Sequence, residues 1–215
     1  MEAAYFVNHA RKDRFPWSLY HRPIARQMAQ IIAGYRRPRV LVVGCGLEPV
    51  LPGVPEAVFH GCDLDRRAIE RCRATMPAMA DRLEVCPSAS ELPARGAFAE
   101  PFDVVLAKEV VEHLHDPGPW ARLLASRVRS GGSLMLSTPN YGWDSTLGVL
   151  EGTILELVAR GDGYSRRDIH PSRFTARSLA KLDVGAGMRL VSVRLPWTRW
   201  TLLGHWVRVR CSSGA

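Results

Sequence analysis

The sequence predicts an α/β protein with a doubly wound, mostly parallel, seven-stranded sheet that ends in an antiparallel pair of strands. Two observations carry this prediction. From Arg39 onwards, short apolar runs alternate with stretches of helical periodicity, which is the pattern of parallel strands covered by helices on both faces. The last two apolar runs, residues 190–195 and 202–209, follow one another so closely that they favour an antiparallel pair at the sheet edge.

The expected elements follow from the apolar pattern and from local start and stop signals. Residues 1–38 are expected to form a basic, helical cap, and residues 39–215 the main domain. Asp65 is a suitable helix N-cap, whereas Gly131 and Gly132 form a helix stop signal. Strands are expected over residues 40–43, 57–62, 83–86, 102–107, 133–137, 190–195 and 202–209. Helices are expected over residues 24–32, 65–76, 119–129, 146–160 and 175–184.

The composition narrows the class of protein. Of the 215 residues, 47% are hydrophobic and 23% are charged, which is typical of a single globular domain and excludes a largely disordered chain. No apolar run approaches the roughly 20 residues of a membrane-spanning helix, and the first residues lack the pattern of a secretory signal. The five cysteines are odd in number and form no C-x-x-C pair, so the sequence favours a reducing, cytoplasmic setting without structural disulfides.

The net charge of +8 is unevenly distributed along the chain. Residues 1–39 carry +6 and residues 164–215 carry +8, whereas the centre, residues 40–163, carries −6. Basic flanks of this kind suit an anionic partner, which could be a nucleic acid, a lipid surface, or an acidic substrate or carrier. The alternative is a solvated, arginine-rich surface, since 26 of the 29 basic residues are arginine.

Small and acidic residues stand where the first two expected strands end. Gly44-Cys45-Gly46 follows the first strand directly, and glycine there allows a tight turn and close approach of a ligand. Asp63 lies 19 residues after Gly44 and could accept hydrogen bonds from both hydroxyls of a ribose. Pro49 stands where a dinucleotide-binding fingerprint needs glycine and opposes a long helix after the turn. The sequence therefore favours a ligand that has a ribose but no pyrophosphate.

Six segments, in this order along the chain, resemble the motifs of class I S-adenosylmethionine-dependent methyltransferases. They are Val40–Gly46, Gly61–Leu64, Phe102–Val105, Glu109–Leu114, Ser130–Gly132 and Ser137–Asn140. The likeness covers residues 39–195, which is most of the chain. It implies the Rossmann-like methyltransferase fold and S-adenosylmethionine as the cofactor.

The same resemblance implies which residues surround the cofactor. The glycine turn would pass the methionine portion, Asp63 would hold the ribose, and the residues after the third and fourth strands would lie beside the adenine and the sulfonium. Glu48 stands where the family often has a third glycine, and it would either point outwards or contact the cofactor amine. Ser88 stands where the family often has aspartate. The implied cofactor-binding residues are Gly44, Cys45, Gly46, Asp63, Leu64, Ser88, Ala89, Ala107 and Lys108.

An E-x-x-E-H segment, Glu109 to His113, follows the fourth expected strand. In a helical turn, Glu109, Glu112 and His113 would share one face, because residues three and four positions apart are neighbours. With His170 from a later loop they would form a mixed oxygen and nitrogen site for a divalent metal such as Mg²⁺ or Zn²⁺. The alternative is metal-free, with His113 as a general base, helped by Glu109 and His170, or with all of them structural.

This segment resembles two methyltransferase groups in which a divalent metal would bind the hydroxyls of the acceptor. One is the ubiquinone-biosynthesis O-methyltransferases. The other is the small-RNA 3′-end 2′-O-methyltransferases, which share a segment similar to Thr138–Tyr141. The favoured prediction is a cytoplasmic O-methyltransferase for a small or medium organic acceptor, with or without metal. The alternatives are an RNA 2′-O-methyltransferase, a metal-independent N-methyltransferase, and a non-catalytic cofactor-binding protein.

Overall fold

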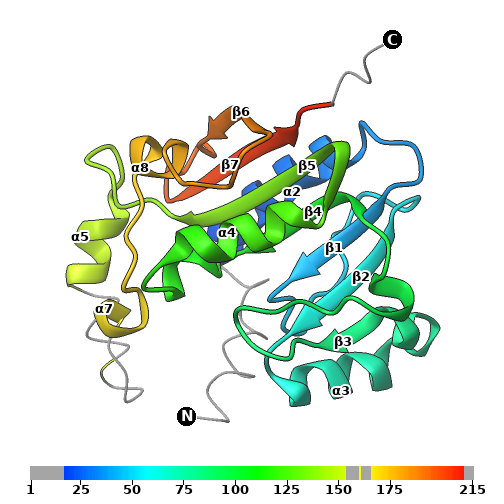
Figure 1. The fold of residues 1–215 in the computed structure, drawn as a ribbon. Coiled ribbons are helices and arrows are strands. Elements are labelled where there is room, and N and C mark those ends of the chain that lie inside the picture. The colour runs from blue at the N-terminus through cyan, green and yellow to red at the C-terminus, as the bar shows by residue number, and fades with distance from the viewer. Residues whose placement is uncertain (1–16, 154–159, 161–165, 211–215) are drawn as a thin grey trace.

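The computed structural model describes residues 17–153, 160 and 166–210. Its strands form one seven-stranded sheet in the order β3-β2-β1-β4-β5-β7-β6 (Figure 1). The first five strands pair in parallel, and β7 pairs antiparallel with β5 and β6. The predicted doubly wound sheet with its antiparallel C-terminal pair is confirmed. The strands are β1 (Arg39–Val43), β2 (Val58–Asp63), β3 (Leu83–Val85), β4 (Phe102–Lys108), β5 (Val128–Pro139), β6 (Met188–Arg194) and β7 (Thr201–Arg208).

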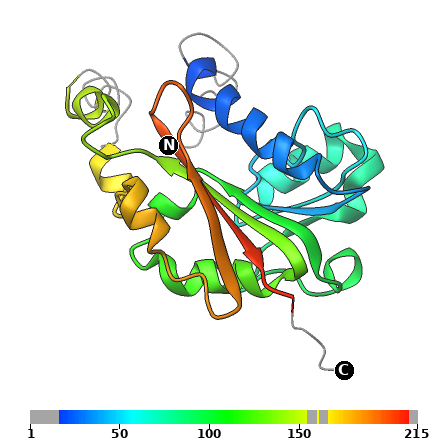
Figure 2. The same cartoon turned by 90° about the horizontal axis from the view of Figure 1, so that it is seen from above.

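Helices cover both faces of this sheet, and Figure 2 shows α2 and α4 on opposite sides of it. The strand order reverses between β1 and β4, so a ligand site is expected beyond the carboxyl ends of these two strands. The helices are α2 (Trp17–Ile32), α3 (Arg66–Thr75), α4 (Pro117–Ser126), α5 (Leu147–Gly152), α7 (Arg166–Ile169) and α8 (Ala176–Ala180). Short 3₁₀ segments are η1 (Pro77–Arg82), which is kinked at Met79, η2 (Gly96–Phe98) and η3 (Val111–His113).

Strand β1 has an unbroken apolar sequence because it is buried on both faces. Val40 and Val42 face α2 and α3 in one hydrophobic cluster. Leu41 and Val43 belong to the other cluster, on the side of the sheet that α4 covers. A parallel strand between two helical layers has no solvent-facing side, so the alternation typical of a half-exposed strand is lost. The same two-sided burial holds the carboxyl end of β1 rigidly in place.

The chain between β1 and β2 contains no helix, as the prolines of this segment predict. Leu51 and Val54 of this loop are buried in the same cluster as α2. Gly61 on β2 makes room for the loop, since a Cβ at this position would lie 2.7 Å from the Cβ of Pro49. The first glycine turn is therefore followed by a packed loop rather than by a helix N-terminus.

The prediction of a helix that ends at Gly131 and Gly132 is wrong. Helix α4 ends at Ser126, and β5 already begins at Val128 and runs through both glycines. A Cβ on Gly132 would lie 2.7 Å from the backbone oxygen of Asp103 on β4. The glycine thus permits close contact between two strands, at a point where their register shifts.

Three helix boundaries also differ from the sequence prediction. Helix α2 begins at Trp17 and continues through Pro23. Proline removes one backbone hydrogen bond, and the full burial of Ile24 and Met28 offsets this loss. Helix α8 covers only Ala176–Ala180 of the expected 175–184. Of the helix expected over 146–160, α5 covers the first part, and residues 154–159 lie outside the described ranges.

None of the helices in the described part of the chain is long and apolar enough to cross a membrane. Helix α2 buries Ile24, Met28 and Ile32 in the cluster that also holds Val40 of β1. The N-terminal helix therefore packs directly on the sheet. The division of the chain at residue 38 stays a prediction.

A chain of polar groups joins the half-buried Tyr35, in the turn after α2, to buried residues of β5 and β7. The hydroxyl of Tyr35 lies 2.7 Å from Ser133 Oγ, which lies 2.8 Å from Nε2 of His205. Burial lowers the pKa of His205 to about 4, and the positive charge of Arg194 acts in the same direction. His205 is therefore neutral in the folded protein at neutral pH.

We expect His205 to make the protein less stable in acid. The pKa of an unfolded histidine is about 6.5, so below that pH the unfolded state binds the proton first, and stability falls until pH reaches the folded pKa. Between pH 7 and pH 5 the free energy of unfolding should fall by about 2 kcal/mol through this residue. Urea unfolding of the wild type and of His205→Gln at both pH values measures the difference, and equal pH dependence in the two proteins would contradict the assignment.

Candidate functional site

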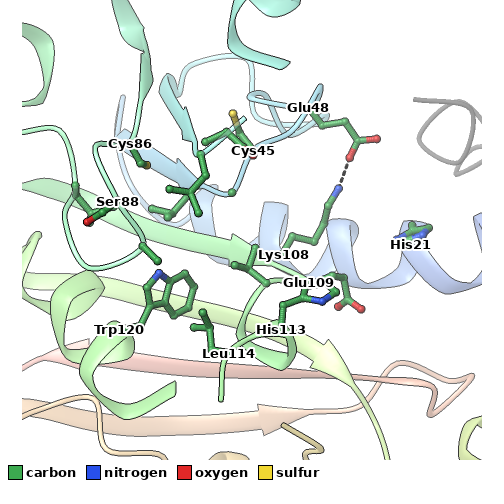
Figure 3. Close-up of a pocket in the computed structure, with 17 residues that line it drawn as sticks. His21, Cys45, Glu48, Cys86, Ser88, Lys108, Glu109, His113, Leu114 and Trp120 are labelled. Atoms are coloured by element: carbon green, nitrogen blue, oxygen red, sulfur yellow. Dashed lines mark hydrogen bonds and ion pairs between the residues drawn. The ribbon is translucent and has the colours of Figure 1, made fainter. Parts of the chain in front are cut away.

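A cavity of about 350 Å³ lies at the carboxyl ends of the parallel strands (Figure 3). Its volume falls within the range of small-molecule sites in proteins. Nearly all of the residues expected around a cofactor line it, and only Gly46 and Ala107 do not. The expected cofactor residues in the lining are Gly44, Cys45, Asp63, Leu64, Ser88, Ala89 and Lys108, and two of the expected catalytic residues, Glu109 and His113, line it as well.

The glycine turn is fixed to the end of β2 by backbone hydrogen bonds. The amides of Gly44 and Cys45 donate to the carbonyl of Cys62 at 2.9 and 3.1 Å. Gly44 and Gly46 both have positive φ angles, 66° and 52°, which side chains other than glycine adopt only with strain. The turn therefore holds a backbone edge open to the cavity at the end of β1.

Asp63 is held by two backbone amides, one on each carboxylate oxygen. The Gly46 amide donates to Oδ2 at 2.7 Å, and the Asp65 amide donates to Oδ1 at 2.9 Å. Each carboxylate oxygen can accept a second hydrogen bond, and the side chain borders the cavity. A rigid carboxylate with an open acceptor site on each oxygen suits the two adjacent hydroxyls of a ribose.

The cavity has an apolar end and a charged end, which Figure 3 shows on its left and right. Cys86, Leu114 and Trp120 lie at the apolar end together with Ser88. At the charged end Glu48 and Lys108 form an ion pair, with Lys108 Nζ 2.5 Å from Glu48 Oε2. Glu48 therefore reaches across to the end of β4.

The expectation that Glu109 shares a helix face with Glu112 and His113 is wrong. Helical geometry begins only at Val111, and Glu109 has a left-handed φ of 57°. The carboxylate of Glu109 accepts hydrogen bonds from Ser137 Oγ at 2.8 Å and from the hydroxyl of Tyr20. The backbone amide of Glu109 donates to the carbonyl oxygen of Ser137 on β5. Glu109 therefore continues the pairing of β4 with β5, and the helical turn η3 begins only after it.

Glu112, His113 and His170 come together although His170 lies far along the chain. One ligand atom of each residue lies within 4.8 Å of the others. Glu112 and His170 are buried, whereas His113 is exposed and borders the cavity. One carboxylate and two imidazoles at these separations fit the ligand set of a divalent transition metal.

Hydrogen bonds orient the two imidazoles of this cluster. Nδ1 of His113 lies 2.7 Å from the carbonyl oxygen of Ile169, which can only accept, so Nδ1 carries the hydrogen. Nε2 of a neutral His113 is then the basic nitrogen. Nδ1 of His170 is 2.8 Å from the hydroxyl of Tyr141.

Three residues of this region do not follow from the sequence pattern. Helix α2 brings His21 to the lining of the cavity and Tyr20 to Glu109, and Trp120 of α4 lines the apolar end. The mixture of aromatic and basic residues before residue 38 is visible in the sequence, but it contains no spacing that indicates which strand ends the helix would reach. The contacts of Tyr20 and His21 depend on how α2 packs against the sheet.

We expect Gly44→Ala to destabilise the protein more than a matched glycine substitution. A Cβ on Gly44 would lie 2.5 Å from Cγ2 of Val110, and φ at this position is positive. Gly96 also has a positive φ, but a Cβ added there would have no atom within 4 Å, so Gly96→Ala carries the backbone strain of about 1–2 kcal/mol alone. The clash should add about 1–3 kcal/mol. Urea unfolding of both variants tests this, and equal losses would refute the close contact.

This chain is similar to one protein-family model and to curated proteins over most of its length. The family model described as "Methyltransferase domain" matches residues 13–193. Ubiquinone biosynthesis O-methyltransferase from Aromatoleum aromaticum is 32% identical over 65% of this chain and 61% of its own length. The enzyme of the same name from Neisseria meningitidis serogroup C is 30% identical over 75% of this chain and 68% of its own length. The chain thus spans about three fifths of the length of the first of these relatives.

Solved structures share the fold at lower identity. Magnesium protoporphyrin IX methyltransferase from Synechocystis PCC 6803 with bound S-adenosylhomocysteine has a TM-score of 0.67 and 15% identity, with 95% of this chain and 94% of that chain covered. The N-methyltransferase NodS from Bradyrhizobium japonicum WM9, in complex with the same compound, has a TM-score of 0.62 and 15% identity, with 92% and 90% covered. By sequence and by fold, the chain belongs to the methyltransferase-domain family of S-adenosylmethionine-dependent enzymes.

Proposed function

We propose that this protein transfers the methyl group of S-adenosylmethionine to a hydroxyl of a small or medium organic acceptor. The single observation that carries the proposal is the placement of His113. Its imidazole borders the cofactor-sized cavity and has its Nδ1 hydrogen fixed by a backbone carbonyl. The names of the curated relatives support a hydroxyl acceptor with aromatic or quinol-like character.

The residues of the cavity fit the cofactor from end to end. Asp63 would hold the ribose hydroxyls, and Ser88 and Ala89 at the apolar end would lie beside the adenine. The turn at Gly44 would lie along the methionine portion. When bound, S-adenosylmethionine supplies an activated methyl group: a new bond to the acceptor oxygen forms as the bond to sulfur breaks, and sulfur keeps the electron pair.

His113 is the residue that we assign to the acceptor proton. Because Nδ1 donates to Ile169, Nε2 can take the proton of the acceptor hydroxyl as the methyl group is transferred. The exposed imidazole then releases this proton to solvent, so the products are a methyl ether, S-adenosylhomocysteine and one proton. Glu109, with its carboxylate held by Ser137 and Tyr20, would shape the wall of the acceptor region.

Glu112, His113 and His170 would also suit a divalent ion, and Zn²⁺ suits this ligand set better than Mg²⁺ because two of the ligands are imidazoles. A bound cation acts as a Lewis acid that lowers the pKa of an acceptor hydroxyl. His113 has only Nε2 available for either role, so it could not be a metal ligand and a general base at once. Glu109 is not part of this group in the described residues, and we leave it out of the proposed ligands.

We place the reaction in a reducing compartment, the cytoplasm, with a small molecule as the acceptor or a group on an anionic carrier. The four cysteines within the described ranges are free and buried, which suits a compartment that keeps thiols reduced.

The Thr138–Tyr141 segment was one of the sequence features that supported the RNA 2′-O-methyltransferase alternative. Asn140 in this segment donates to Asp144 and to the carbonyl of Arg199, so its amide is used to join two loops.

The test is a transfer assay with S-adenosylmethionine labelled with ¹³C in the methyl group. A panel of catechols and a panel of primary amines serve as acceptors, with EDTA, with added Zn²⁺ and with added Mg²⁺. The proposal predicts a ¹³C methoxy signal on catechols. Loss of the signal in EDTA and its recovery with Zn²⁺ would assign His113 to the metal, whereas an unchanged rate would assign it as the base. Transfer to amines alone would contradict the proposal.

A further inference from the structure

The backbone of Glu109 is strained at the edge of the cavity. Three residues other than glycine have a positive φ in the described part of the chain, namely Arg37, Glu109 and Arg199, and of these three Glu109 alone lines the cavity. A residue with a side chain adopts this left-handed conformation only with strain, and keeps it only where its surroundings hold it. Such strain is concentrated at functional sites, so the contacts that hold Glu109 are candidates for a role in the reaction.

Two residues from distant segments hold Glu109. The fully buried Ser137 of β5 accepts the backbone amide of Glu109 on its carbonyl oxygen and on Oγ, both at 3.2 Å, and its hydroxyl donates to Oε1 of Glu109 at 2.8 Å. The hydroxyl of Tyr20 on α2, 89 positions away, donates to Oε2. We call these three residues the Tyr20–Glu109–Ser137 clamp, and it joins α2, the end of β4 and β5.

The turn at Glu109 determines where His113 lies. Strand β4 ends at Lys108, and η3 begins at Val111 and ends at His113, so Glu109 begins the change of direction between them. An extended Glu109 would let the chain continue along β4 and would carry His113 away from the cavity. In the observed conformation, Glu109 and His113 both lie at the charged end of the cavity (Figure 3).

We propose that the Tyr20–Glu109–Ser137 clamp positions His113 for methyl transfer. Glu109 is then a positioning residue that acts through its backbone turn, and its carboxylate locks this turn to α2 and β5. The ring of Tyr20 also packs edge-on against His21, with 4.8 Å between the ring centroids, so the clamp holds a second lining residue in place. The inference rests on the proposed function, because it takes His113 as the residue that acts on the acceptor.

A carboxylate that acts directly on the acceptor or on a cation would behave differently from a clamp. Direct action needs the negative charge, which glutamine lacks. A clamp needs hydrogen bonds, and the amide of glutamine can accept from Ser137 through its oxygen and donate to the hydroxyl oxygen of Tyr20 through its nitrogen. Alanine offers neither, so it leaves the strained turn free to relax. Glu109→Gln and Glu109→Ala therefore distinguish the two roles.

The experiment measures single-turnover methyl transfer to catechols and the dissociation constant of S-adenosylhomocysteine for the wild type, Tyr20→Phe, Glu109→Gln and Glu109→Ala. Tyr35→Phe is the matched control, because the Tyr35 hydroxyl also pairs with a serine of β5, Ser133 at 2.7 Å, but Tyr35 does not line the cavity. Histidine side-chain spectra of the ¹⁵N-labelled proteins report the surroundings of the His113 imidazole without any acceptor.

We expect the rate to fall about tenfold or more in Tyr20→Phe and about a hundredfold in Glu109→Ala, with less than about a threefold change in the dissociation constant. Glu109→Gln should keep at least about a third of the rate, because its hydrogen bonds remain. Tyr35→Phe should transfer methyl groups at the wild-type rate. The His113 signals should shift in Tyr20→Phe and in Glu109→Ala, and should stay in place in Tyr35→Phe.

Two results would overturn the clamp. Equal loss of rate in Glu109→Gln and Glu109→Ala would give the carboxylate a direct chemical role. Unshifted His113 signals in Glu109→Ala would show that the imidazole is positioned without it. Absence of transfer by the folded wild type would refute the proposed function, whereas the spectra test the clamp independently of activity.

Discussion

Asp63→Ala should weaken the binding of S-adenosylhomocysteine by about a hundredfold or more. The substitution removes a carboxylate whose two oxygens are held by the amides of Gly46 and Asp65 and which would accept both ribose hydroxyls. Hydrogen bonds to a charged group contribute about 1.5–3 kcal/mol each, so the loss of two accounts for this factor. Calorimetric titration measures the dissociation constant directly.

Asp65→Ala is the matched control for this prediction. Asp65 caps helix α3 by accepting from the Arg67 amide at 2.9 Å, and it does not line the cavity. Its loss should cost about 1 kcal/mol of stability and leave the dissociation constant unchanged. Wild-type affinity in Asp63→Ala, or equal loss of affinity in both variants, would refute the assignment of the ribose site.

His113→Ala should lower the rate of methyl transfer by about 10²–10⁴-fold. In this variant Nε2 is absent, and with it the proposed base or metal ligand at the edge of the cavity. Binding of S-adenosylhomocysteine should change only a few-fold, because the proposed cofactor contacts lie on Asp63 and the glycine turn. Single-turnover rates at saturating cofactor separate the two effects.

His115→Ala provides the comparison for that experiment. His115 is exposed, lies two residues further along the chain, and does not line the cavity. It should transfer methyl groups at the wild-type rate. Full activity of His113→Ala would remove His113 from the reaction, and a parallel loss of rate and cofactor affinity would make it a structural residue.

The parts of the fold that follow from local pattern were predictable. The unbroken apolar run of β1 indicates a strand that is buried on both faces. Gly44 directly follows β1 and Asp63 ends β2, so the strand pattern also locates both residues at the edge where a ligand is expected. The helix end predicted at Gly131 and Gly132 was wrong, because glycine occurs both at helix ends and where two strands approach closely. Only the tertiary contact with Asp103 distinguishes the two.

The candidate site was predictable only in part, for a similar reason. Of the expected group of Glu109, Glu112, His113 and His170, the last three come together and Glu109 does not. The left-handed backbone of Glu109 depends on its bonds to Ser137, and nothing in the spacing indicates it. The pairing of Glu48 with Lys108, 60 positions apart, depends on the strand order.

The most direct test of the central claim is calorimetric titration of the full chain with S-adenosylhomocysteine, with and without EDTA. The cavity at the ends of β1 and β4 should bind one molecule with a dissociation constant in the micromolar range or below, and EDTA should leave that constant unchanged. In the proposed site Glu112, His113 and His170 would act on the acceptor, whereas Asp63, which is not part of their group, would hold the ribose. A folded protein that gives no heat of binding would contradict the account.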